Sequence, residues 1–324
     1  MWGNRLGWGI SAVIAIVVIG SLSYYVRAAS AISDPTPFGL DVADDTVAIG
    51  VPVQTVLAAP PQSCDAAQPY SEAIALYRRE PRLYDDVASG ASRASDVSQL
   101  PAIQRLIEGA ACKEMTLFAG DPGKVVRYGE SSDIDALRTI GKAAVRVGLV
   151  HQAAKRNKDA IAAYEAAFAL GAKLYDERLT YRQMMVGTDL MGEAGIGLSR
   201  LAFNTGDTNR SEAAQKFDAA RLSTFKSRVS PVASKLISID AQVVSRHAGD
   251  VFYLAENADE RMWRVEAILA LGRMRFFVGE GKRIGDQRGA AKQIQRYVDD
   301  KDPVIRAAAN AALGLTREQM RRLG

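Results

Sequence analysis

Trp263 begins the ten-residue sequence WRVEAILALG, which ends at Gly272 and returns 42 positions later as IRAAANAALG, from Ile305 to Gly314. In both copies a large apolar residue is followed by Arg, then by Ala at three-residue intervals, and finally by Leu-Gly. This spacing places the apolar residues on one face of a helix that ends at a glycine. The chain therefore contains a helical repeat near its C-terminus.

The length of this repeat is typical of stacked two-helix units, whose periods run from about 30 to 50 residues. The stretch DKDPVIRAAANAALG at 300–314 resembles a HEAT repeat. The resemblance covers 258–314 and implies an α-solenoid, in which stacked helical hairpins display a long curved surface for binding other proteins.

The overall composition favours helices throughout the globular part. Hydrophobic residues make up 48% of the 324 residues, but aromatic residues only 7%. Alanine, which favours helices, is abundant, whereas strands favour aromatic and β-branched residues. We therefore expect an all-α fold with a sizeable core.

A second helical pattern lies between residues 140 and 225. Small and aromatic residues are spaced there as in a tetratricopeptide repeat, first at Gly148, Ala160, Tyr164 and Ala167, and again at Leu201, Ala213, Phe217 and Ala220. The resemblance implies paired helices, with small residues that allow close approach and an aromatic side chain that fills the gap. Because the two copies are 53 rather than 34 residues apart, an ordinary helical bundle remains the alternative.

An uncharged run from Gly7 to Val26 is long enough, at about 30 Å as a helix, to cross the hydrocarbon core of a membrane. We interpret it as a retained single-pass anchor in the inner (cytoplasmic) membrane. Arg5 lies before the run and only Arg27 follows closely, which favours a cytoplasmic N-terminus with the bulk in the periplasm or another extracytoplasmic space. The alternative is a signal peptide cleaved near Ala31, after which the protein would be secreted.

The anchor and the two patterns divide the chain. Residues 32–69 contain six prolines and are expected to form an extended linker, in which 46–51 could add an edge strand. The predicted parts are an N-terminus and anchor at 1–31, the linker at 32–69, a small helical segment at 70–130, TPR-like hairpins at 131–257 and HEAT-like repeats at 258–324.

The chain has two cysteines, Cys64 and Cys112, which flank helices predicted at 70–79 and 100–117. In an oxidising compartment they would form a disulfide. If the domain were cytosolic, two buried thiols would be an equally good interpretation.

The excess positive charge lies in the C-terminal part. Residues 258–324 contain 14 Lys or Arg and 9 Asp or Glu, whereas the whole chain has a net charge of only +4. Such a surface attracts an acidic protein, anionic lipid or nucleic acid, unless it is only a solvated face. Nucleic acid is not expected, because no basic run exceeds two residues.

No catalytic, cofactor-binding or metal-binding motif is recognisable. The chain has two histidines, His151 and His247, and the glycines at 279–281 lack the spacing of a phosphate loop. We therefore expect neither an enzyme nor a small-molecule substrate, but a scaffold or protein-binding subunit of a cell-envelope complex. The alternative is an unrecognised helical hydrolase or lytic domain acting on cell-wall polymer.

The end of the chain suggests an interface. The last repeated helix is rich in alanine, and only residues 316–323 remain to cover it. We predict that a protein partner or a second copy of the chain docks there. The alternative is that the final helix serves as a cap. The candidate interface residues are Ile305, Leu313, Arg317, Arg321 and Arg322.

Overall fold

The computed structural model describes residues 47–58, 60–92, 100–129, 131–238, 240–276, 287–316 and 318–320. The predicted anchor at 7–26, the possible cleavage site near Ala31 and the predicted interface residues Arg317, Arg321 and Arg322 lie outside these ranges. Within them, no helix combines the length and the apolar character needed to span a bilayer.

The described chain is mostly helical, as its composition predicts. Its core is continuous from Val47 to Ala312. The main helices are α2 (Ala67–Arg79), α3 (Pro81–Ser89), α4 (Pro101–Ala110), α5 (Ser132–Ala153), α6 (Asn157–Glu177), α7 (Tyr181–Asn204), α8 (Thr208–Thr224), α9 (Ser230–Leu236), α10 (Ala241–Ser245), α11 (Ala248–Asn257), α12 (Arg261–Met274), α13 (Gln287–Gln295) and α14 (Pro303–Gly314).

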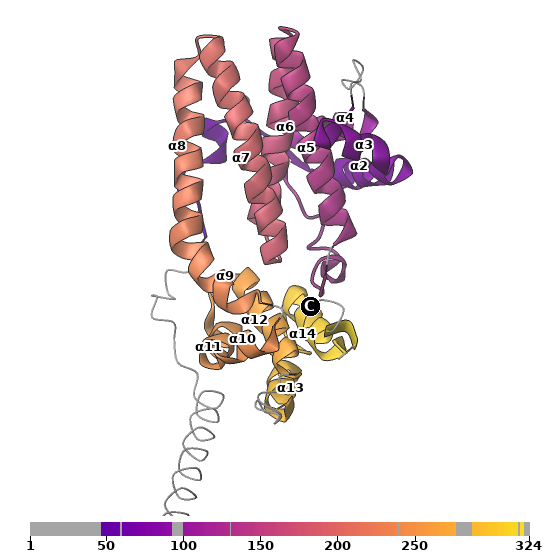
Figure 1. The fold of residues 1–324 in the computed structure, drawn as a ribbon, viewed down its shortest axis with the longest axis vertical. Helices are drawn as coiled ribbons and strands as arrows, with labels where there is room; N and C mark the ends of the chain where they lie inside the picture. Colours follow the sequence, from indigo (N-terminus) through magenta and orange to yellow (C-terminus); the bar gives the residue numbers. More distant parts are fainter. Residues whose placement is uncertain are drawn as a thin grey trace, which may run out of the picture.

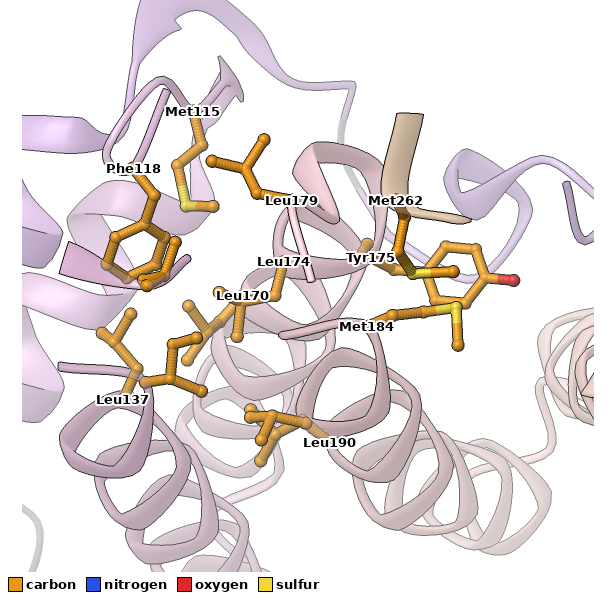
Figure 2. Packing of buried hydrophobic residues seen from close by; sticks show 14 of the residues in the cluster. Met115, Phe118, Leu137, Leu170, Leu174, Tyr175, Leu179, Met184, Leu190 and Met262 are labelled. Carbon is orange, nitrogen blue, oxygen red and sulfur yellow. The ribbon is translucent and has the colours of Figure 1, made fainter. Parts of the chain in front are cut away.

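The helices form two groups (Figure 1). The long helices α5 to α8 lie side by side with α2, α3 and α4 along one flank, and α9 to α14 gather at one end of the long helices. Figure 2 shows the core of the first group, where Leu137, Leu170 and Leu190 come from α5, α6 and α7. Met262 of α12 belongs to the same core, so the two groups share one apolar interior.

Tyr164 on α6 fills the space between two glycines. Its ring is fully buried, and a Cβ built on Gly148 of α5 or on Gly197 of α7 would lie 2.7 or 2.5 Å from a ring atom. Both glycines therefore allow a neighbouring helix to approach the aromatic side chain. The contact between Gly148 and Tyr164 is the one that the repeat spacing predicts.

The two repeated helices of the C-terminal part, α12 and α14, pack against each other. A Cβ on Gly272 would lie 3.0 Å from the Cα of Ala312, and Ala312 is fully buried. The side chain of Asp302 caps α14 by accepting a hydrogen bond from Val304 N at 2.8 Å. The equivalent α12 is buried around most of its circumference, because α9 to α11 cover one side and α14 covers another.

Near the start of the described chain the structure corrects the predicted end of one helix. The helix predicted at 100–117 ends at Ala110, and β2 (Cys112–Glu114) follows, paired in parallel with β1 (Gln62–Asp65). Cys64 and Cys112 form a disulfide, as predicted for an oxidising compartment. The cross-link brings these two segments together, so backbone groups after Ala111 bond to the neighbouring strand rather than to a further helical turn.

Residues 47–58, which we call the strap, belong to the predicted linker. They form no strand; instead they contain the 3₁₀ turn η2 (Val53–Thr55) and lie against the helices, beside α8 (Figure 1). Val47 and Val56 are fully buried. The strap is therefore a packed segment, because its apolar residues gain more from burial than from remaining extended in water.

Two of the candidate interface residues at the chain end, Ile305 and Leu313, lie within the described ranges. Ile305 is fully buried within the C-terminal group, and Leu313 is half-buried. Packing of α14 against α12 covers the apolar side of α14, which leaves Ile305 unavailable to a partner.

Candidate functional site

A cavity of about 290 Å³ lies where the two groups of helices meet. We call it the junction cavity. Its walls come from the segment before α5, the starts of α5 and α7, the residue after α9, and α12. It is lined by Val125, Arg127, Tyr128, Gly129, Ser131, Ile134, Thr180, Tyr181, Arg182, Ile237, Glu266, Leu269 and Arg273. Sites between structural units are common places for ligands.

Helix α12 contributes three side chains to the junction cavity, Glu266, Leu269 and Arg273. They are three or four residues apart, which places them on one face of the helix. Glu266 and Arg273 are 7% and 5% exposed. Because they are separated by two helical turns, about 10 Å along the axis, they mark different regions of the cavity wall.

Each of these buried charges has a hydrogen-bond partner. Glu266 accepts a bond from Tyr181 N at 2.9 Å, at the start of α7. Arg273 donates from Nη2 to the carbonyl oxygen of Leu236. The Nε of Arg273 is buried and has no hydrogen-bond partner among the described residues. An unpaired buried donor is costly, so this atom is a feature to explain.

Burial dominates the electrostatics of the junction cavity. It raises the pKa of Glu266 and lowers the pKa of Arg273, because both charged forms lose water. The guanidinium of Arg273 lies 5.9 Å from the centre of the Tyr128 ring, within range of a cation–π interaction. The Tyr128 hydroxyl donates to the carbonyl oxygen of Leu269 and has a raised pKa, also from burial.

The rim of the junction cavity adds positive charge. Arg127 is exposed, and Arg182 pairs with Asp135 of α5. Three arginines therefore line the cavity together with one carboxylate, Glu266. Because its lining has more arginines than carboxylates, the cavity favours an anion over a cation.

A second cavity, of about 330 Å³, lies under the strap against α6, α7 and α8. It contains one carboxylate, Asp176, whose pKa is raised by burial. Glu177 has a raised pKa for the same reason, but it accepts hydrogen bonds from Phe118 N and Ala119 N, both at 2.9 Å. Each described cavity thus holds one carboxylate of raised pKa.

The strap is held at both ends by ion pairs on the helices. At its start, Val47 N donates to Glu260, which pairs with Arg178 at 3.1 Å. At its other end, Ala58 N donates to Glu165 at 2.6 Å, and Glu165 pairs with Arg210. These bonds give a partner to two backbone N–H groups, those of Val47 and Ala58. Within the described chain the strap pairs with no strand that could provide one.

One surface of the long helices exposes apolar side chains. Arg138 and Lys142 on α5 form ion pairs with Asp189 and Glu193 on α7, at 3.6 and 3.0 Å. Helical spacing places further side chains on the same side of these two helices. We call this surface the α5–α7 face. Its large apolar residues are Leu149, Ile196 and Phe203, which are 38%, 49% and 71% exposed.

His151 lies in the interior of the protein. It is 4% exposed, and burial lowers its pKa. Among the described residues, no group of three or more His, Cys, Asp or Glu side chains could hold a metal ion.

The residues of the junction cavity were not recognised in the sequence. Glu266 lies in the first copy of the repeat and Arg273 directly follows it, whereas Ala308 and Leu315 occupy the matching positions in and after the second copy. Two charged residues, seven positions apart on one face of a helix, thus stand where the matching positions are apolar. This difference is the sequence feature that could have indicated the cavity. The chain matches no protein-family model, no curated protein and no solved structure.

Proposed function

We propose that this protein is a membrane-anchored helical scaffold that binds protein partners outside the cytoplasm, as a subunit of a cell-envelope complex. The observation that carries the proposal is the α5–α7 face. Large apolar side chains surrounded by charged residues are typical of the surfaces that proteins use to bind one another. Phe203, at 71% exposed, is its most accessible large apolar residue.

The arrangement of the helices supports an α-solenoid with TPR-like and HEAT-like parts. Neighbouring helices pack through small residues at the repeated positions, as at Gly148 against Tyr164 and at Gly272 against Ala312. In such a fold, binding depends on the shape and side chains of a surface rather than on a catalytic centre. The proposal therefore includes no enzymatic activity, cofactor, nucleic acid or small-molecule substrate.

The proposed location rests on the uncharged run at 7–26 and on the disulfide. A disulfide persists in compartments such as the periplasm and is rare in the cytoplasm. Alkaline phosphatase fused after residue 46 should be active and should remain with the membrane fraction. An inactive fusion would reverse the orientation, and an active fusion in the soluble fraction would support cleavage near Ala31.

The binding surface can be tested by charge substitution on α7. We expect the pair Ile196→Asp and Phe203→Asp to remove proteins that cross-link to the wild-type chain in cells, with an unchanged circular dichroism spectrum. Leu222→Asp is the matched control, because Leu222 is 52% exposed on α8, outside the α5–α7 face. Recovery of the same cross-linked partners with the double variant would exclude this face as the binding surface.

The proposed second contact is at the chain end, where Arg321 and Arg322 would hold a protein partner or a second copy. Changing both to Glu should abolish self-association or co-purification at this end without changing the melting temperature. If the complex is unaffected, the final residues act only as a cap. The hydrolase alternative has no comparable support, since each described cavity contains a single carboxylate of raised pKa.

A further inference from the structure

We propose that the junction cavity binds a small organic carboxylate, whose carboxyl group is held by Arg273. This inference is independent of the scaffold role and adds a ligand to the protein. It begins from the position of Arg273, which is 5% exposed, lines the cavity and has a buried Nε without a hydrogen-bond partner among the described residues.

A carboxylate in the cavity would meet the guanidinium of Arg273, which lines its wall. Arginine presents several N–H groups in one plane, and their geometry matches the two oxygens of a carboxylate. One Nη of Arg273 is already engaged by the carbonyl oxygen of Leu236, which fixes the guanidinium against the end of α9. The ligand would therefore meet a donor that is already oriented, which reduces the entropy lost on binding.

The charges that line the cavity favour an anion. Three of its lining side chains, Arg127, Arg182 and Arg273, are arginines, and one, Glu266, is a carboxylate. A negatively charged ligand is therefore attracted to this cavity, whereas a cation is not.

The remaining walls suit an apolar or aromatic body. Val125, Ile134, Ile237 and Leu269 line the cavity beside the rings of Tyr128 and Tyr181. Tyr181 is itself held in a stacked arrangement with Trp263, 6.3 Å between ring centres. The volume of about 290 Å³ is at the lower end for ligand sites and matches a compact acid rather than a large cofactor.

Glu266 lies about two turns from Arg273 on the same face of α12. One of its oxygens accepts the bond from Tyr181 N, and the other can accept a bond from a hydroxyl group at the far end of a ligand. A small hydroxylated aromatic acid would thus use both buried charges. The walls belong to both groups of helices, so such a ligand would also bridge them.

The test uses the full-length protein in detergent, with benzoate and 4-hydroxybenzoate as probes and acetate and inorganic phosphate as comparisons. Melting temperature is measured against probe concentration. We expect a saturable increase with the aromatic carboxylates, and little with acetate or phosphate. No saturable increase with either aromatic acid, or an equal increase with phosphate, would overturn the proposal.

The variant Arg273→Gln should weaken binding on the order of 10- to 100-fold. Arg264→Gln is the matched control, because Arg264 is on the same helix but pairs with Asp300 and does not line the cavity. Equal affinities for these two variants would refute the role of Arg273. If Arg273→Gln does not fold, Arg127→Gln replaces it, because Arg127 is exposed at the rim and its loss should still weaken binding several-fold.

Discussion

Gly171 of α6 and Gly187 of α7 face each other across the contact between the two helices. A Cβ built on Gly171 would lie 2.7 Å from the carbonyl oxygen of Gly187, and one built on Gly187 would lie 2.6 Å from the carbonyl oxygen of Gly171. Both obstructing atoms belong to the backbone. Neither can move aside as the end of a flexible side chain could, so the two glycines set the distance between α6 and α7.

The first prediction follows from this contact. Gly187→Ala should destabilise the protein by about 1–3 kcal/mol, because α6 and α7 must separate. Gly195→Ala, on the same helix, is the control, since its Cβ would lie 3.6 Å from the Phe168 ring at ordinary contact distance. Alanine should there be neutral or stabilising, because it favours a helix over glycine. Urea unfolding of both variants measures the difference, and equal stability would contradict the close approach.

The second prediction concerns the disulfide. Cys64 and Cys112 are separated by 48 positions, and loss of the cross-link frees a loop of that size in the unfolded chain. Replacing both cysteines with serine should lower the free energy of unfolding by about 4 kcal/mol in the chain-entropy model. A reducing agent should destabilise the wild-type protein and leave the double variant unchanged. Two freely alkylated thiols in protein purified without reductant would argue against the bond.

The third prediction tests the start of the strap. Glu260 accepts from Val47 N and pairs with Arg178, and both side chains of the ion pair are largely buried. Glu260→Gln should cost about 1.5–3 kcal/mol, because Arg178 keeps its charge without a carboxylate. It should also make residues 47–58 more sensitive to protease. Glu256→Gln breaks the exposed pair with Arg296 and should cost less than about 1 kcal/mol. Similar losses in the two variants would refute a special role for the buried pair.

The fourth prediction concerns pH. Burial raises the pKa of Glu266 above its ordinary value of 4.5, so the folded protein binds this proton more tightly than the unfolded chain. The contribution of Glu266 to the free energy of unfolding is fully present below pH 4.5. It is lost as the pH rises through the pKa that Glu266 has in the folded protein. Glu266→Gln keeps an oxygen that can accept from Tyr181 N. The variant should be more stable than the wild type at pH 7 and should lose this advantage at pH 4. Chemical unfolding of both proteins at pH 7 and at pH 4 measures the difference. An advantage independent of pH would contradict the shift.

Local patterns predicted the character of the helices. The apolar face repeated at 263–272 and 305–314 became α12 and α14, and Asp302 caps the second of them. The small-to-aromatic spacing predicted the contact between Gly148 and Tyr164. These features depend on residues near one another in the chain, or on a spacing set by the helix itself, so they can be read from the sequence.

The positions of distant segments were decided by tertiary structure. Periodicity shows which side of a helix is apolar, but it does not show which segment covers that side. Packing therefore buried Ile305, which had been expected at an interface, and laid residues 47–58 against the long helices. The parallel pairing of β1 with β2 likewise required the folded chain to bring Cys64 beside Cys112.

The junction cavity shows the same division. The sequence by itself determined that Glu266 and Arg273 share one face of a helix, because seven residues make two turns. Only the tertiary structure decided that this face meets Tyr128, Tyr181 and the arginines at the rim, which come from segments far away in the chain. Burial and charge at such a site are properties of several segments together, since each side chain loses its water only when the others arrive.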